Sequence, residues 1–263
     1  MVLTDIEDGV ATVTLNAPEK YNALSPEMIS ELNRVFSEIA SDSAVRVCVM
    51  TGAGAGFCAG ADLSAGQADQ EDPILRADSS SRAMREDLNP LIKKILNLPV
   101  PTVAAVNGVA AGGGYGLALA ADLVIASQKA SFKLVFTPQL GLIPDLGASW
   151  HAPHRLGRAQ ALALSFFGDT MSASEAVDRG LIWKAVPHDQ LAVEANRVAE
   201  ILARGPTHAY VAVRRAYDHA SVSTLEQQLD YEADTQPTLI AKDDFLEGVR
   251  AFIAKRKPSF KGR

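Results

Sequence analysis

Two glycine-rich segments of the sequence could bring backbone N–H groups against a ligand. The first is Gly56–Leu63 (GFCAGADL) and the second is Asn107–Gly116 (NGVAAGGGYG). Each follows an apolar run, and each is built of small residues that let a backbone approach a ligand closely. Two such N–H groups converging on one oxygen would form an oxyanion hole, which stabilises negative charge developing on that oxygen. The alternative is that these glycines serve tight turns and helix–sheet packing, and for either segment alone we favour that interpretation.

The elements around these segments alternate between strands and helices. VLTDIE and VATVTLN, joined at Asp8-Gly9, predict a hairpin, and VRVCVMTG, PTVAAVNG and LVIAS predict buried strands. Ser25-Pro26 predicts the start of a helix, and the second glycine-rich segment opens another, whose free N–H groups favour negative charge. This alternation predicts an α/β core with parallel strand pairing.

The rest of the chain is predicted to be mostly helical. Residues 76–97 have helical spacing of apolar side chains, and from His154 onward the sequence is almost wholly helical. Two capping boxes are predicted, Ser172 with Glu175 and Ser223 with Glu226. We therefore divide the chain into a core, residues 1–188, and a helical C-terminal region, residues 189–263. The last helix, residues 245–257, carries an apolar stripe that packs either against the core of this chain or against a partner subunit.

Composition excludes several classes of protein. The 263 residues are 48% hydrophobic and 21% charged, which is typical of a globular chain of one or two domains. The net charge of −6 argues against nucleic acid as a partner. Two cysteines, Cys48 and Cys58, exclude a disulfide framework and a cysteine-rich zinc site, and they fit the reducing cytosol.

Other familiar motifs are absent or out of place. The uncharged stretch 95–121 is long enough to raise the question of a membrane span, but prolines and glycines interrupt it, so we predict a buried strand and a buried helix. Gly54–Ala59 fits the dinucleotide pattern G-x-G-x-x-A but follows a hairpin, a helix and a third strand rather than opening a βαβ unit. His151 and His154 have no nearby acidic or cysteine residue at zinc spacing, so we expect no metal.

Several longer stretches together resemble the enoyl-CoA hydratase/isomerase (crotonase) family. They are PEKYNAL, GFCAGADL, AVNGVAAGGGYGLALAADLVIA, LGLIPDLGASW, SASEAVDRGLIWKAV and FLEGVRAFIAKRKPSF. The resemblance implies a crotonase-like spiral of ββα units with a helical C-terminal region that serves trimerisation. It also implies an acyl-CoA thioester as substrate, no cofactor beyond the coenzyme A of that substrate, no membrane partner, and a homotrimer or homohexamer.

The resemblance also assigns roles to particular residues. The N–H groups of Ala61 and Gly113 would bind the thioester carbonyl oxygen. The CoA moiety would lie along Ala59–Leu63, with Ala59, Ala61, Asp62 and Leu63 in contact. Lys20 and, from a neighbouring subunit, Lys255 are the candidates for contacting CoA phosphates; each could equally be a solvated surface charge. We expect Asp62 mainly to shape its turn or to cap the following helix.

The acid–base residue decides the reaction. The family's hydratases use two glutamates, and the corresponding positions here are Gly116 and Thr137, neither of which transfers protons as a carboxylate does. Asp145 stands where the family's isomerases carry their acid. A carboxylate near an apolar acyl pocket has a raised pKa and is a stronger base once ionised, and one base suffices to move a proton between two carbons. The alternative role for Asp145 is to cap the helix that starts around Gly147.

The resemblance therefore predicts an enoyl-CoA isomerase. GLIPDLGASW is closest to the branch that converts ring-1,2-epoxyphenylacetyl-CoA to oxepin-CoA in phenylacetate degradation and also shifts double bonds in enoyl-CoAs. Alternatives remain open: enoyl-CoA hydration, a dehalogenase-like reaction with Asp145 as nucleophile, and a non-catalytic acyl-CoA-binding or RNA-associated relative. The basic end KRKPSFKGR could serve CoA phosphates or form a solvated tail.

Overall fold

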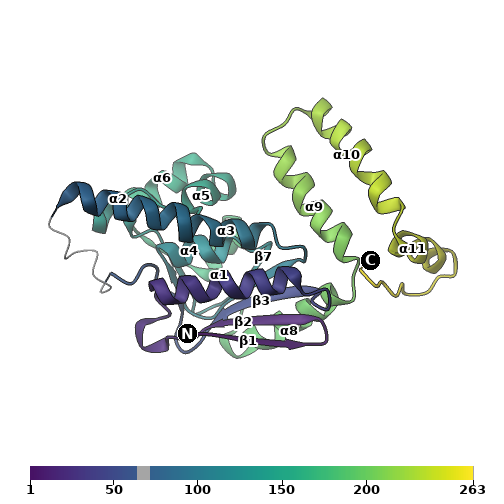
Figure 1. Ribbon diagram of the computed structural model, residues 1–263, viewed down its shortest axis with the longest axis horizontal. Coiled ribbons are helices and arrows are strands. Elements are labelled where there is room, and N and C mark those ends of the chain that lie inside the picture. The colour runs from purple at the N-terminus through teal and green to yellow at the C-terminus, as the bar shows by residue number, and fades with distance from the viewer. Residues whose placement is uncertain (64–71, 263) are drawn as a thin grey trace.

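The larger of two β-sheets organises the chain (Figure 1). The computed structural model describes residues 1–63 and 72–262. The larger sheet has the order β1-β2-β3-β5-β7-β10. Its strands are β1 (Val2–Glu7), β2 (Val10–Leu15), β3 (Val47–Gly52), β5 (Thr102–Val106), β7 (Leu123–Ser127) and β10 (Lys184–Val186). The predicted hairpin is confirmed, because β1 and β2 pair antiparallel, and the predicted parallel core is confirmed by every other pairing in this sheet.

A second sheet lies beside the first and has the order β4-β6-β8-β9. Its strands are β4 (Gly56–Cys58), β6 (Val109–Ala111), β8 (Ser131–Lys133) and β9 (Thr170–Ser172). The first three each follow a strand of the larger sheet directly along the chain, and they pair with one another in parallel. The chain therefore repeats a strand–strand–helix unit, which is the spiral predicted from the family resemblance.

Helices cover these sheets and close the core. They are α1 (Pro26–Ser41), α2 (Pro73–Ala83), α3 (Asn89–Leu96), α4 (Gly113–Leu119), α5 (Ala148–Leu156), α6 (Arg158–Phe167) and α7 (Ala173–Asp178). The uncharged stretch forms a buried strand and a buried helix, as predicted: all residues of β5 and α4 are buried. Among the described residues no helix is both long and apolar enough to cross a membrane.

The C-terminal helices divide into one that joins the core and three that stand away from it. Helix α8 (Leu191–Ala203) packs against the larger sheet, where Ala195 and Val198 are buried with strand residues such as Val49 and Val103. The other three, α9 (Thr207–Ala220), α10 (Leu225–Ile240) and α11 (Asp243–Ile253), extend to the right of the core in Figure 1. The apolar stripe of α11 is not covered by this chain's core, since Phe252 is 85% exposed.

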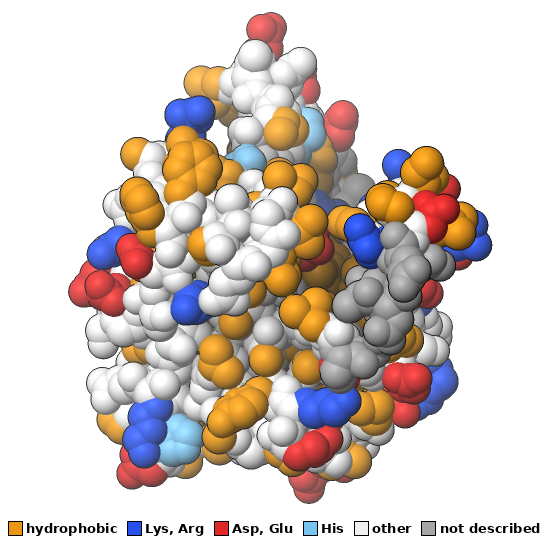
Figure 2. Space-filling view, turned by 90° about the vertical axis from the view of Figure 1, so that its left-hand side faces the viewer, with side chains coloured by type: hydrophobic (Ala, Val, Ile, Leu, Met, Phe, Trp, Pro, Cys, Tyr) orange, Lys and Arg blue, Asp and Glu red, His pale blue; other side chains and the backbone are white. Residues whose placement is uncertain are grey.

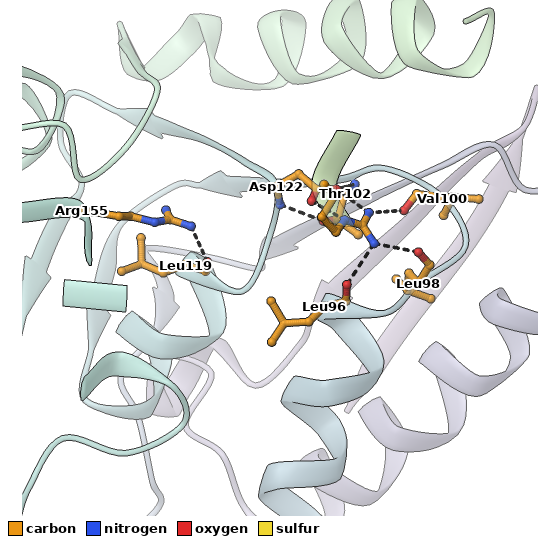
Figure 3. Close-up of polar contacts among 8 residues, drawn as sticks. Leu96, Leu98, Val100, Thr102, Leu119, Asp122 and Arg155 are labelled. Carbon is orange, nitrogen blue, oxygen red and sulfur yellow. Dashed lines mark hydrogen bonds and ion pairs between the residues drawn. The ribbon is translucent and has the colours of Figure 1, made fainter. Parts of the chain in front are cut away.

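Arg214 fixes α9 to the core, and Figure 3 labels its partners on the core, Leu96, Leu98, Val100 and Asp122. The Arg214 guanidinium makes two 2.6 Å contacts with the carboxylate oxygens of Asp122. It also donates to the carbonyl oxygens of Leu96, Leu98 and Val100. These three carbonyls belong to the last residue of α3 and to the turn before β5. The first of the projecting helices is therefore held where the chain enters β5.

Candidate active site

The two glycine-rich segments lie directly against each other. A Cβ atom built on Gly60 would lie 3.0 Å from the backbone nitrogen of Gly113 and 2.8 Å from the carbonyl oxygen of Ala111. One built on Gly114 would lie 2.0 Å from the carbonyl oxygen of Cys58. Side chains at these positions would therefore force the segments apart. Gly60 also has a φ of +95°, which glycine adopts without strain.

This contact brings two backbone N–H groups close together. The segment containing Ala61 is held against Leu24, which donates to the carbonyl of Gly60 and accepts from the N–H of Asp62. Gly113 is the first residue of α4, where helix N–H groups have no partner inside the helix. Within residues 1–63 and 72–262, neither Ala61 nor Gly113 uses its N–H in a hydrogen bond. Both donors can therefore serve a ligand, and the helix dipole at Gly113 favours negative charge there.

Two asparagines support the first segment from behind. The Asn22 side chain is fully buried; it donates to the carbonyls of Ala53 and Gly56 at 2.9 and 2.8 Å. Asn107 donates to the carbonyls of Gly54 and Gly56 at 2.9 and 3.1 Å. Our sequence reasoning assigned neither asparagine this role. The available signal for Asn22 was its residue type, because asparagine is enriched at the left-handed backbone conformation it adopts, φ 58°.

Asp145 lies beside the start of α4. It precedes Leu146, whose Cδ1 is 3.1 Å from the position of a Cβ on Gly113. Its carboxyl oxygen Oδ1 is buried and has no hydrogen-bond partner. Burial raises the pKa of Asp145 to about 6, with a smaller opposing effect from its own backbone N–H. The turn that carries this partly desolvated carboxylate therefore packs against Gly113, the residue that bears one of the two N–H donors.

The side chain of Asp145 does not cap helix α5. The N-cap of that helix is Gly147, and no side chain accepts a hydrogen bond there. Only the backbone carbonyl of Asp145 contributes, by accepting from the N–H of Ala148 at 2.8 Å. The capping role considered as the alternative for Asp145 is therefore wrong, and the carboxylate is left for another function.

The two positions of the hydratase glutamates offer no carboxylate. Thr137 lies in η4, a π-helical turn (Phe136–Leu140), and its hydroxyl donates to the carbonyl of Leu142 at 2.9 Å. Gly116 has no room for a side chain, because a Cβ there would lie 2.3 Å from the carbonyl oxygen of Leu146. The local structure at Gly116 thus excludes a glutamate as long as Leu146 keeps this position.

The first of the two candidate lysines lies at the glycine-rich segment. Lys20 Nζ is 2.8 Å from Asp62 Oδ2, and this carboxylate raises the pKa of the lysine. The Lys20 side chain is 51% exposed, so its ammonium group stays open to a ligand. Leu63, at the end of the segment, is also exposed. Helix α2 is capped by the Asp72 side chain. The expectation that Asp62 caps what directly follows it falls on residues 64–71, which lie outside the described residues.

The second candidate lysine is not brought to this segment by its own chain. Lys255 follows α11, which stands apart from α4 in Figure 1. It is exposed, and its backbone φ is 50°. A contact between Lys255 and coenzyme A therefore needs a second copy of the chain.

Comparisons with known proteins agree with this arrangement. The model of the family described as enoyl-CoA hydratase/isomerase matches residues 5–263. The chain is 41% identical to 1,2-epoxyphenylacetyl-CoA isomerase of Escherichia coli (strain K12), over 100% of this chain and 98% of that protein. It is 42% identical to a "Probable enoyl-CoA hydratase" of Rhodobacter capsulatus, over 98% and 97%. A solved enoyl-CoA hydratase from Bacillus anthracis superposes with a TM-score of 0.90 at 32% identity, over 100% of this chain and 99% of that one.

The chain therefore belongs to the enoyl-CoA hydratase/isomerase family, as its sequence motifs indicated. The two relatives above are named for reactions of CoA thioesters, and the chain is an enzyme of this family. Both isomerases and hydratases stand among the relatives, so the reaction has to be argued from the site itself.

Proposed function

We propose that this chain is an acyl-CoA isomerase with Asp145 as its single acid–base. It shifts a double bond in an enoyl-CoA or isomerises the ring epoxide of 2-(1,2-epoxy-1,2-dihydrophenyl)acetyl-CoA to oxepin-CoA. One observation carries the proposal: the Asp145 carboxyl has its Oδ1 buried without a hydrogen-bond partner, in the turn that packs against Gly113, while Gly116 and Thr137 supply no second carboxylate.

In a double-bond shift the two N–H donors and Asp145 have different roles. The thioester oxygen accepts hydrogen bonds from the N–H groups of Ala61 and Gly113. Asp145 removes a proton from C2, and the electron pair moves into the carbonyl to give an enolate, whose negative charge the two N–H groups stabilise. Loss of one such donor typically lowers the rate about 10²–10³-fold. Asp145 then returns the proton at C4, so the product has the same composition as the substrate.

The pKa of Asp145 suits this task. A carboxyl group with a pKa of about 6 is mostly ionised at neutral pH, yet it binds a proton more strongly than an ordinary aspartate does. It can therefore take up a proton from carbon and release it again. Hydration makes a further demand, since water has to be held and activated while a proton is added to the substrate. The closed space at Gly116 argues against that reaction.

Two observations narrow the class of acyl group: the name of one relative, and the apolar side chains exposed near α2. The Escherichia coli relative is named for 1,2-epoxyphenylacetyl-CoA, which supports a ring epoxide and a place in phenylacetate catabolism. The end of the molecule that carries α2 shows hydrophobic side chains around a hollow (Figure 2). Exposed apolar residues of α2 and of the loop after η4 include Ile74, Leu75, Leu142 and Ile143. Such side chains suit an apolar acyl group.

The coenzyme A moiety and the subunit arrangement complete the proposal. CoA lies along Ala59–Leu63, Lys20 contacts its phosphates, and Lys255 of a neighbouring subunit adds a second positive charge. A homotrimer or homohexamer would supply that subunit. The projecting helices support this, because they leave an apolar hollow of about 710 Å³, lined in part by Phe245, Val249 and Phe252, open to a partner.

The test is to incubate the purified protein with 2-enoyl-CoA, 3-enoyl-CoA and the ring epoxide, and to identify the products by mass spectrometry. Isomerisation in H₂O conserves mass, and in D₂O deuterium enters carbon to the extent that the proton on Asp145 exchanges with solvent before it is returned. Asp145→Asn should abolish turnover and leave CoA-thioester binding intact. A product heavier by one water, or a covalent adduct on Asp145, would refute isomerisation and indicate hydration or nucleophilic attack.

A further inference from the structure

Leu146, the residue after the candidate base, has an unusual backbone. Its φ is 46°, in the left-handed region, and its side chain is buried. For a bulky residue other than glycine this conformation is rare and unfavourable, so it persists only where the surroundings impose it. Gly147 follows with a φ of 80°. The chain thus turns sharply immediately after Asp145.

The turn after Asp145 packs against glycines of α4 on one side and against the ring of His151 on the other. The Leu146 side chain lies over Gly113, with Cδ1 3.1 Å from where a Cβ would be, and its carbonyl oxygen lies 2.3 Å from the Cβ position of Gly116. On the other side, the buried His151 ring lies 3.3 Å from the Cβ position of Gly147. The first turn of α4 and one ring of α5 therefore enclose the turn.

We propose that Leu146 is a positioning residue: its left-handed backbone, fitted onto Gly113 and Gly116, fixes the Asp145 carboxylate beside the oxyanion donors. The same fit determines the reaction type, because the carbonyl of Leu146 occupies the space that a glutamate side chain at position 116 would need. This inference rests on the proposed function. If it holds, the turn that positions Asp145 also requires that position 116 has no glutamate.

The backbone contribution can be separated from the size of the side chain. Leu146→Met keeps an apolar side chain of similar size that, like leucine, is unbranched at Cβ. Leu146→Val keeps apolarity but is β-branched, which disfavours a positive φ strongly. We expect Leu146→Met to keep kcat within about threefold of the wild type, and Leu146→Val to lower kcat at least about tenfold with little change in KM, as loss of a transition-state interaction does. Leu156→Val is the matched control, because Leu156 is also buried but lies in helix α5.

A second readout does not depend on turnover. The Asp145 carboxyl carbon can be followed by NMR in protein labelled with ¹³C-aspartate, and its signal can be assigned by its loss in Asp145→Asn. In Leu146→Val the carboxyl should titrate closer to an ordinary aspartate, because a displaced turn lets water reach it, whereas in Leu146→Met it should titrate as in the wild type. If the wild type turns over no enoyl-CoA or epoxide, the proposed function fails, while this titration still tests the turn.

Gly116→Ala tests the same contact from the other side and serves if Leu146→Val does not fold. Its Cβ would meet the Leu146 carbonyl, so kcat and the Asp145 titration should both change as in Leu146→Val. The inference is overturned if a folded Leu146→Val or Gly116→Ala keeps wild-type kcat and wild-type titration. It is also overturned if Leu146→Met is as damaging as Leu146→Val, since the size of the side chain would then decide.

Discussion

The partial burial of Asp145 should make its replacement stabilising at neutral pH. Burial raises the pKa of this carboxyl from 3.8 to about 6. The folded state therefore holds a proton that the unfolded chain has already released. As the pH rises through this window, the wild type loses stability because a charge has to exist in a poorly solvated place. Asp145→Asn carries a neutral side chain of the same shape and escapes this loss.

The size of the effect follows from the shift. One pKa unit corresponds to about 1.4 kcal/mol, so a shift of about two units sets an upper limit of about 3 kcal/mol. The carboxyl is only partly buried, and solvent screens part of this energy. We therefore expect Asp145→Asn to unfold with a free energy about 1–2 kcal/mol above that of the wild type at about pH 8, and with little difference below about pH 4, where both forms are neutral.

The assay is urea unfolding of both proteins across this pH range at one fixed protein concentration, since assembly would make stability concentration-dependent. Asp169→Asn is the control, because Asp169 is exposed and its replacement should change stability by less than about 0.5 kcal/mol at any pH. A gap between Asp145→Asn and the wild type that does not grow with pH would refute the desolvation of Asp145. The same pKa predicts that wild-type kcat rises with pH through about 6 and levels off above it.

Three further predictions concern the oxyanion donors, the CoA phosphates and the anchor of α9. Gly60→Ala should lower kcat about 10²-fold by separating the two N–H donors, while Gly157→Ala, also at a positive φ but with nothing within 4 Å of its Cβ position, should leave steady-state kcat nearly unchanged. Lys20→Gln should raise KM for acyl-CoA several-fold with kcat within about twofold, as loss of uniform binding does; an unchanged KM would contradict its assignment. Arg214→Met should destabilise the fold by about 2–3 kcal/mol in urea unfolding, because it removes the cation from the partly buried Asp122 carboxylate, which keeps its contacts with Thr102, and takes the donor from three carbonyl groups. Arg204→Met, which removes an exposed ion pair, should cost less than about 0.5 kcal/mol, and equal losses for the two arginines would contradict the anchor.

Local patterns were sufficient for the elements whose structure is decided by neighbouring residues. Ser25 caps α1 as predicted, with its side chain accepting from the N–H of Met28. The capping box at Ser172 and Glu175 is present. The second predicted box was wrong by one residue: Thr224, not Ser223, caps α10, and it pairs with Gln227. Two overlapping capping sequences compete there, and the sequence alone does not show which one the preceding turn favours.

Longer elements depended on packing that the sequence does not display. The helix predicted over residues 76–97 is present as one helical run, in which a π-helical turn over Met84–Leu88 joins α2 to α3. The apolar side chains at the end of that range, such as Leu91 and Ile95, are buried as predicted, whereas no residue of α2 is buried. Helical spacing therefore identified the C-terminal half, which packs against the core. It did not reveal at which residue that contact begins.

The site was predictable in its residue types but not in its geometry. The motifs named Asp145 and the glycine-rich segments, because those residues recur in the family pattern. Nothing in the stretch 141–147 indicates that a leucine adopts a left-handed backbone, since leucine does not favour it. That conformation is imposed by Gly113 and Gly116, which come from an earlier unit of the fold. The backbone conformation of Leu146 thus depends on contacts between segments far apart in the sequence, which local sequence patterns do not reveal.

Under the proposed function, the packing at Gly116 links two features that would make this chain an isomerase and not a hydratase: the presence of Asp145 and the absence of a glutamate at position 116. Replacing glycine at that position would add a side chain and, at the same time, remove the surface on which the Leu146 carbonyl rests. An added glutamate would therefore displace Asp145 before it could act beside it. For this reason we expect Gly116→Glu to lose isomerase activity without gaining hydration. Recovery of hydration would require a coordinated change in the turn that follows Asp145, because the base and the missing acid share one packing contact.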